Sequence, residues 1–326
     1  MASRLKQAWW ALARGNYRQA VLDLLPAGAP FDRIVVTSHY RKRFGRRPDL
    51  ASPGAFSERI VALMLSMDGR SEIRGQVTDK DLVKRFVAER LGHAATPATL
   101  AVLESAAAVR EFRYPERCAI KATHDSGSHV FRRAGEPIDI ERIVSWFGRN
   151  YYFELREPSY RFLQPKVIVE ELLGRDGEDL PDFKLFCFHG VPAFIQVDTT
   201  RFVDHRRSFY SPRWRELDLQ VTYPACTTLV PRPADLDTML DYAAKLSKGF
   251  SFLRVDLYSV DGRLLVGELT NYPDGGIGDF ASREAAVRVG SLFDDPGQEI
   301  ESLVGLSLRE QEAPAHASPA GATAAL

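Results

Sequence analysis

Two acidic residues give the first sign of a reactive site. Asp256 and Glu268 lie on two expected strands joined by Asp261-Gly262, a pair typical of tight β-hairpin turns. A three-residue loop would place the two carboxylates opposite each other, whereas a two-residue loop would place them on opposite faces. Facing carboxylates repel each other unless a divalent cation lies between them. Depending on the register, the pair is a magnesium site or two solvated strand acids.

A lysine followed by a loop of small residues forms a second candidate site. Lys121 lies on an expected strand that leads into Asp125-Ser126-Gly127-Ser128. Short side chains let backbone N–H groups surround an anion, and the lysine adds positive charge. The segment therefore suits a polyphosphate. The alternative is a solvated hairpin tip.

Common signatures of nucleotide-binding and hydrolytic enzymes are absent from the sequence. It contains no G-x-x-x-x-G-K-[ST], no G-x-G-x-x-G after a strand, no H-E-x-x-H and no G-x-S-x-G. The histidines show no metal-ligand spacing. Cys118, Cys187 and Cys226 fit neither a disulfide framework nor a zinc ribbon, which favours a reducing cytoplasm.

Composition indicates a globular protein. At 326 residues the chain has the length of roughly two domains. Hydrophobic residues make up 45% and charged residues 26%, which is enough apolar material for a core. The 43 basic and 43 acidic side chains balance, so no overall field attracts nucleic acid. No stretch approaches the ~18 apolar residues of a membrane span.

Periodicity and turn signals predict an α+β protein that begins with helices. Helices are expected within 57–91 and over 106–112, 138–153 and 236–248. Strands are expected over 118–122, 130–132, 166–171, 182–188, 193–198, 252–258 and 263–270. We divide the chain into a basic helical arm (1–50), a helical subdomain (51–112), a main domain (113–308) and a disordered tail (309–326).

The amino-terminal arm is strongly basic. Residues 1–50 contain ten basic and three acidic side chains, a net charge of +7. Apolar residues recur in it at helical spacing: Leu5, Trp9, Leu12, Val21, Leu22 and Leu25. The arm could lie on an anionic membrane as an amphipathic helix. Alternatively, its apolar stripe packs on the protein and its arginines are solvated.

Six segments in order carry a resemblance to a known family. They are Asp79–Val83, Ile120–Gly127, Val169–Leu173, Leu180–Phe188, Phe252–Tyr258 and Gly267–Thr270. Together, between Arg41 and Phe293, the chain resembles the ATP-grasp enzymes and, within them, the TupA-like group associated with bacterial surface-polysaccharide synthesis. The resemblance implies two α+β subdomains that clasp ATP, preceded by a mainly helical region.

The resemblance also implies which residues bind ATP. Lys121 would contact the phosphates, and Ser126, Gly127 and Ser128 would close over them. The adenine would meet Glu170, Glu171 and Leu172, and the ribose would meet Asp182. Three cations would act in catalysis: Lys184 and Arg201 facing the triphosphate, and Arg254 stabilising charge on the transferred phosphoryl group.

Magnesium would be held by Asp256 and Glu268. Many ATP-grasp enzymes read E-x-N at this strand, whereas here Thr270 stands two places after Glu268 and Asn271 follows one place late. Thr270 fits the TupA-like pattern. A hydroxyl is a poorer magnesium ligand than an amide carbonyl, so both Thr270 and Asn271 are candidates for the remaining position.

The implied activity is that of an ADP-forming carboxylate–amine ligase, dependent on ATP and magnesium, that acts through an acyl phosphate. It would join an amino acid or peptide to a uronic-acid carboxylate of capsule or cell-wall polysaccharide, with the acceptor near Tyr272–Gly276. We expect a cytoplasmic protein with peripheral inner-membrane contact through its arm, and no nucleic-acid partner.

Three other functions remain open at this stage. The same phosphate-handling residues could serve an ATP-dependent sugar or glycan kinase. A glycosyltransferase could use Asp176, Glu178 and Asp179 in place of a metal-binding D-x-D, although these acids lie in a polar loop. A non-catalytic adaptor would not need Lys121 or two acids placed face to face.

Overall fold

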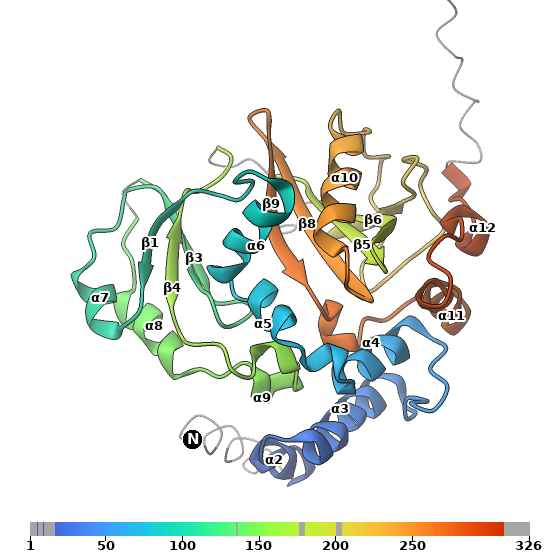
Figure 1. Cartoon of the computed structure of the whole chain (residues 1–326), viewed down its shortest axis with the longest axis horizontal. Helices are drawn as coiled ribbons and strands as arrows, with labels where there is room; N and C mark the ends of the chain where they lie inside the picture. The colour runs from blue at the N-terminus through green and yellow to red at the C-terminus, as the bar shows by residue number, and fades with distance from the viewer. Residues whose placement is uncertain are drawn as a thin grey trace, which may run out of the picture.

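The chain folds into two antiparallel sheets that lie side by side, with helices around them (Figure 1). The computed structural model describes Leu5, Trp9 and residues 17–134, 136–175, 180–199 and 204–309. The helices are α2 (Tyr17–Leu24), α3 (Ala29–Phe44), α4 (Phe56–Leu65), α5 (Glu72–Thr78), α6 (Leu82–Leu91), α7 (Ala106–Glu111), α8 (Ile140–Ser145), α9 (Tyr152–Leu155), α10 (Leu236–Ser247), α11 (Arg283–Gly290) and α12 (Ile300–Val304). This architecture confirms the α+β class and the helical beginning.

The first sheet carries the small-residue loop. Its strands, in spatial order, are β1 (Thr99–Leu103), β4 (Val167–Glu170), β2 (Cys118–Ala122) and β3 (His129–Arg132). Helices α7 and α8 pack on it through a core that contains Val109, Ile143, Ile120 and Val169. The loop joins β2 to β3, as the sequence predicted.

The first sheet begins before residue 112, the position where we expected the main domain to begin. β1 pairs with β4, so the first sheet begins at Thr99 rather than after α7. A five-residue apolar stretch fits a buried strand and a helix segment equally well, and its pairing depends on a partner far along the chain.

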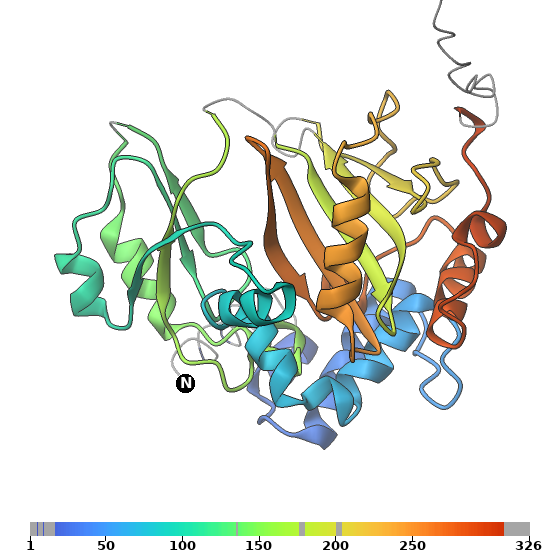
Figure 2. The same ribbon diagram turned by 45° about the horizontal axis from the view of Figure 1, so that its top comes forward.

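The second sheet has one apolar face and one mixed face. Its order is β7 (Arg206–Tyr210), β6 (Val191–Thr199), β5 (Asp182–Phe188), β8 (Phe252–Val260) and β9 (Arg263–Thr270). On one face Leu185 and Val255 share a core with residues of α6 and α10. Figure 2 shows α10 lying across this sheet. On the other, Phe186 and Phe188 pack against Phe56 of α4. Because side chains alternate along a strand, Asp182 and Lys184 share this second face and form its polar end.

The helices α2 and α3 are fastened to the body by Arg156, which follows α9. Its guanidinium donates to the backbone oxygens of Leu25 (2.5 Å) and Pro26 (2.8 Å) and lies 3.3 Å from the buried Asp32 carboxylate. Tyr152 also donates to Asp32. We call this set of contacts the Arg156 clamp. It fixes the described part of the basic arm as a packed helical unit.

Candidate functional site

The β8–β9 hairpin places the two predicted acids opposite each other. Its turn, Asp261-Gly262, has two residues, and both have positive φ (51° and 70°), as a tight hairpin turn requires. That turn alone would put the acids on opposite faces. A register shift beyond Leu257 leaves Gly267 without a partner, so Asp256 pairs with Glu268. The facing arrangement is therefore created by a β-bulge and not by a three-residue loop.

Gly267 is suited to this bulge because there is no room for a larger residue. A Cβ at this position would lie 2.3 Å from Cε2 of Tyr258. The glycine thus lets β9 lie close to the neighbouring tyrosine ring while its backbone adds the extra residue.

Arg254 connects the facing acids. Its Nε and Nη2 each donate to an oxygen of Asp256 at 2.7 Å, and Nη2 also donates to Oγ1 of Thr270 at 3.0 Å. Thr270 in turn donates to Oε1 of Glu268 at 2.7 Å. Although burial raises the pKa of Glu268, the charges of Arg254 and Lys80 lower it below its ordinary value. The carboxyl is therefore held in its charged form.

Lys184 lies among three carboxylates on the same face. Its Nζ contacts Asp182, lies 3.5 Å from Oδ2 of Asp198 and lies 3.8 Å from Oδ2 of Asp256. Asp198 also accepts from Nε of Arg207 at 2.7 Å. Burial raises the pKa of Asp198, but Arg207 and Lys184 outweigh burial and hold it well below its usual range. These buried charges compensate one another.

On the first sheet, Lys121 is oriented by Glu170. Its Nζ lies 2.8 Å from Oε2 of Glu170, and Nζ of Lys84 lies 2.5 Å from Oε1. Glu170 is buried, and the two lysines lower its pKa against the effect of burial. The predicted ATP-binding residues Lys121 and Glu170 are thus in direct contact.

Glu171 links the two sheets. Its carboxylate accepts from the backbone N–H of Ala98 at 2.8 Å and from two guanidinium nitrogens of Arg263 at 2.8 and 3.1 Å. Arg263 begins β9, whereas Glu171 directly follows β4. Leu172 comes next and is partly buried. The segment expected to meet adenine therefore lies where the chain passes from the first sheet towards the second.

The small-residue loop is held by cations that sequence reasoning did not assign. Oγ of Ser128 donates to Asp125 at 2.6 Å and accepts from Nη1 of Arg149 at 2.6 Å. Nζ of Lys80 donates to the backbone oxygen of Asp125 at 2.6 Å. Gly127 has φ 86°, a conformation that favours glycine. Burial raises the pKa of Tyr151, and the side chain of this tyrosine forms a hydrogen bond with that of Ser126.

Lys80 also connects the loop with the acids of the second sheet. It experiences the charges of Glu268, Asp125 and Lys121, and burial lowers its pKa. Lys80 lies in the turn before α6 and Lys84 in the first turn of that helix, and no local pattern reported the contacts that either lysine makes. Through Lys80 the two predicted sites form one charged region.

Asn271, the other candidate for the remaining magnesium position, is held in a separate network. It is buried, and its Oδ1 accepts from Nη1 of Arg74 at 2.9 Å. Its Nδ2 donates to the backbone oxygen of Arg74 and to Oγ1 of Thr78. The amide is thus committed to a structural network. Thr270 remains the candidate third oxygen beside Asp256 and Glu268.

Asp256 and Glu268 supply oxygen donors of the kind that magnesium uses. Across the part of the chain that the structure describes, no group of three or more His, Cys, Asp or Glu side chains could hold a metal ion. Magnesium commonly uses one or two carboxylates together with substrate phosphates and water. The facing pair meets that requirement only when a phosphorylated ligand completes it.

Some predicted residues lie outside the described residues. These are the candidate catalytic cation Arg201, the acids Asp176, Glu178 and Asp179, and the expected tail beyond Arg309. For the helices of the described ranges, none combines the length and apolarity of a membrane-spanning segment.

A buried acid, Glu157, lies in the electrostatic field of Glu268. Burial raises the pKa of Glu157 to about 8, and the charges of Glu268 and Asp274 raise it as well. In an unfolded chain a glutamate titrates near 4.3. Between about pH 4.3 and 8 the folded chain holds a proton that the unfolded chain has lost, so stability falls as pH rises through this window.

We therefore expect Glu157→Gln to flatten this pH dependence. In the unsubstituted protein Glu157 should lower the unfolding free energy by up to about 1.4 kcal/mol for each pH unit between about pH 5 and 7. In the variant this decrease should be absent. Urea unfolding of the nucleotide-free protein at several pH values measures it. Glu89→Gln on the exposed face of α6 is the control and should leave the profile unchanged. Parallel profiles for Glu157→Gln and the unsubstituted protein would contradict the assignment.

These features define an α+β protein in which a cation-rich loop on one sheet and paired carboxylates on a second sheet form one charged region. The sequence model of the family described as TupA-like ATPgrasp matches residues 58–294. The chain belongs to this family, and the resemblance drawn from the six segments is confirmed.

Solved structures of several ligases are distantly similar. The ATP-grasp ligase PsnB, complexed with a minimal precursor, is 16% identical with a TM-score of 0.38, and the match covers 65% of this chain and 59% of that one. The D-alanine–D-alanine ligase from Helicobacter pylori is 15% identical with a TM-score of 0.37, and the match covers 70% of this chain and 57% of that one. Phosphoribosylamine–glycine ligase from Thermotoga maritima is 15% identical with a TM-score of 0.39, and the match covers 70% of this chain and 56% of that one.

The chain therefore spans less than two thirds of the length of these proteins. No curated protein matches it. The assignment to a family rests on the family match and not on these structures.

Proposed function

We propose that this chain is an ADP-forming carboxylate–amine ligase that uses ATP and magnesium and passes through an acyl phosphate. The observation that carries the proposal is the facing pair Asp256 and Glu268, bridged by Arg254 and Thr270 on the polar end of the second sheet. A purely structural pair of acids would gain nothing from facing each other. Family membership supports ATP as the phosphoryl donor.

The ATP would lie between the loop of the first sheet and the polar end of the second. Lys121 contacts the phosphates while Glu170 holds its ammonium group in place. Ser126, Gly127 and Ser128 close over the phosphates. Glu171 and Leu172, together with the backbone of Glu170, meet the adenine, and Asp182 meets the ribose.

Three cations would neutralise the phosphoryl group during transfer: Lys184, Arg201 and Arg254. Lys184 and Arg254 are buried or nearly so and are already oriented by carboxylates, which lowers the cost of arranging them at the moment of reaction. Asp256, Glu268 and Thr270 would hold magnesium, which supplies positive charge to the phosphate oxygens. The carboxylate substrate must then attack in line with the leaving ADP.

We further propose the substrates implied by the TupA-like resemblance: a uronic-acid carboxylate of a surface polysaccharide, and an amino acid or peptide as the amine. The segment Tyr272–Gly276 would receive the acceptor. Asp274 within it has a positive φ of 51°, a strained conformation of the kind often found at binding sites. Peripheral contact with the inner membrane, through the basic helices, would bring the enzyme to such a polymer.

Hydroxylamine trapping tests the reaction. The full chain is incubated with ATP, magnesium, hydroxylamine and glucuronic or galacturonic acid. Transfer of the γ-phosphoryl group from ATP to the uronic-acid carboxylate gives an acyl phosphate and releases ADP. Hydroxylamine then takes the acyl group, which gives a hydroxamate and releases inorganic phosphate. We expect hydroxamate in proportion to ADP, lost in Lys184→Met and kept in Lys245→Met, an exposed lysine on α10.

Two other outcomes identify the alternatives. ADP and a phosphorylated sugar without hydroxamate would indicate a glycan kinase and overturn the ligase. Turnover of a UDP-sugar without ADP formation would indicate a glycosyltransferase. Neither outcome depends on membrane binding.

A further inference from the structure

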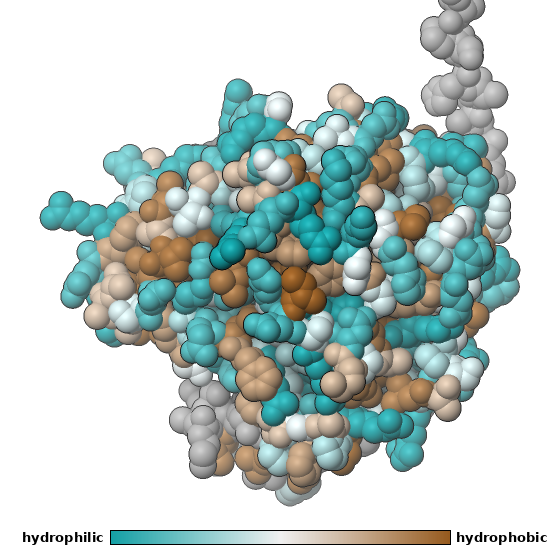
Figure 3. All heavy atoms as spheres, in the orientation of Figure 1, coloured by the Kyte–Doolittle hydropathy of each residue, from teal (hydrophilic) through white to brown (hydrophobic). Residues whose placement is uncertain are grey.

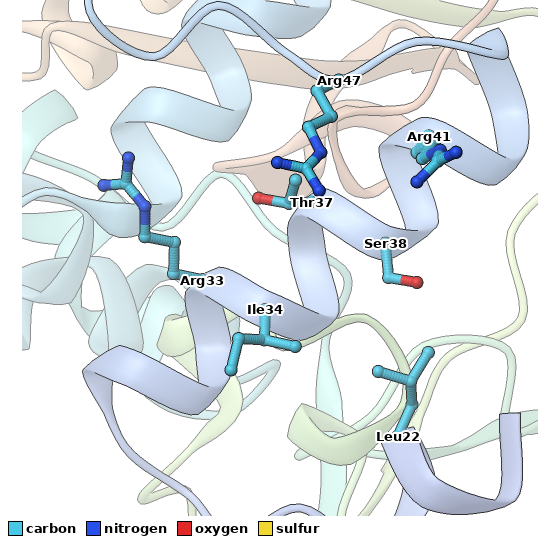
Figure 4. A pocket seen from close by; sticks show the side chains of 7 residues that line it. All are labelled: Leu22, Arg33, Ile34, Thr37, Ser38, Arg41 and Arg47. Atoms are coloured by element: carbon cyan, nitrogen blue, oxygen red, sulfur yellow. The ribbon is translucent and has the colours of Figure 1, made fainter. Parts of the chain in front are cut away.

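A pocket rich in arginine lies between α2 and α3, away from the predicted ATP site. Its volume is about 350 Å³, and three of its lining residues are Arg33, Arg41 and Arg47 (Figure 4). In Figure 4 Arg47 reaches back from the segment after α3 towards Thr37, and Leu22 approaches from α2. The pocket thus combines guanidinium groups with hydroxyl and aliphatic side chains.

No ion pair of Arg33, Arg41 or Arg47 is found within the described residues, and all three side chains are exposed. Their neighbours differ: Arg43 lies 3.0 Å from Asp279, and Arg46 is paired with Glu58. The ion pairs on α3 and just after it therefore do not involve the arginines of the pocket. The guanidinium groups of these arginines are available to bind an anion. Guanidinium groups bind phosphate oxygens in a bidentate manner.

The two helices that form the pocket also carry exposed apolar side chains. On α2, Tyr17 (70% exposed), Val21 (61%) and Leu24 (48%) follow helical spacing and form one stripe. On α3, Ile34 is 51% exposed and lines the pocket itself. Brown atoms lie among teal and pale ones at the lower edge of the molecule in Figure 3, where α2 and α3 are found. We call these four residues and the three arginines the α2–α3 face.

Apolar side chains beside arginines match the boundary region of a bilayer. Apolar groups enter the region between headgroups and acyl chains, while arginines bind lipid phosphates. A soluble phosphate ester would use the arginines but would leave the exposed stripe of α2 without a role. Charge complementarity therefore favours an anionic membrane as the occupant.

We propose that the pocket of Arg33, Arg41 and Arg47 binds the phosphate of an anionic phospholipid and docks the α2–α3 face on a bilayer. This rests on the peripheral membrane contact in the proposed function and gives it a site. The Arg156 clamp joins this face to the segment that carries Glu157. A docked protein would thus hold its catalytic region at a fixed height above the membrane.

Vesicle sedimentation with the full chain tests the proposal. We expect binding to phosphatidylcholine vesicles that contain about 30% phosphatidylglycerol, and little binding to phosphatidylcholine alone. Changing all three arginines, in Arg33→Gln/Arg41→Gln/Arg47→Gln, should weaken binding on the order of 100-fold, at about fivefold for each lost charge near the surface. The variant Val21→Ser/Ile34→Ser should also weaken binding without a change in charge.

A matched control has the same net charge as the arginine variant. It carries Arg85→Gln, Arg213→Gln and Arg232→Gln, three exposed arginines in ion pairs elsewhere. Equal losses in both triple variants would show nonspecific attraction and overturn the proposal. So would full binding by the pocket variant. If inorganic phosphate or glycerol 3-phosphate shifts the melting temperature through these arginines while vesicles do not bind, the pocket belongs to a soluble ligand. The assay contains no ATP, so a lack of vesicle binding would not contradict the proposed ligase reaction.

Discussion

Replacing Asp256 with Asn is expected to remove the magnesium-dependent part of ATP binding. Asn has the same shape but lacks the charge that a magnesium ion needs from this position. At 100 times its dissociation constant, magnesium-ATP should stabilise the unsubstituted protein by about 2.7 kcal/mol. The variant should show the same melting temperature in ATP with and without magnesium.

The comparison with and without magnesium is made within each protein. This matters because Asp256→Asn also removes a counter-charge from the buried Arg254 and Lys184 and should lower the stability of the nucleotide-free protein. Asp261→Asn is the control, since it lies in the turn of the same hairpin and Asn tolerates positive φ. A full magnesium-dependent shift in Asp256→Asn would refute the metal assignment.

The second large effect is expected at Arg74, which joins the helices to the second sheet. Its side chain is fully buried. Nη1 donates to the backbone oxygen of Phe252 at 3.0 Å and to Oδ1 of Asn271 at 2.9 Å, and Nη2 donates to Asp68 at 2.9 Å. Arg74→Ala would leave the acceptors of Phe252 and Asn271 without their donor in the interior, and the partly exposed Asp68 without its charged partner. We expect a loss of about 3–5 kcal/mol in unfolding free energy.

Urea unfolding measures this loss. Arg85→Ala on α6 is the matched control, because Arg85 is exposed and paired only with Glu89. Its effect should stay within about 0.5 kcal/mol. A loss at Arg74 no larger than that of the control would show that the network around Asn271 does not stabilise the fold.

Local patterns predicted most of the elements, because strands and turns leave short-range signals. The hairpin around Asp261-Gly262 and the end of α6 at Gly92, with φ 78°, are examples. The bulge also had a local signal, since an isolated glycine within a strand marks such positions, and Gly267 is one. The turn alone left the pairing of Asp256 with Glu268 open, and the bulge at Gly267, which was not predicted, decides it.

The roles of Asn271 and Lys80 could not be predicted in the same way. Asn271 is bound by Arg74, 197 positions away, and no local pattern reports such a contact. Lys80 acts at the loop through the backbone oxygen of Asp125, a partner that depends on how α6 packs beside the first sheet. Residue types near Glu268 suggested a metal ligand, and tertiary packing decided which side chain was available.

The Arg156 clamp also bears on how the protein can be shortened. The family match begins at Glu58, and a fragment that started there would look complete by that criterion. It would lack Asp32 and the backbone oxygens of Leu25 and Pro26, which together hold a guanidinium that is buried in the intact chain. That cation would be released beside its neighbour in the chain, Glu157, whose pKa the charge of Glu268 helps to raise. The smallest fragment that preserves these contacts of Arg156 therefore reaches back through α3 to the end of α2.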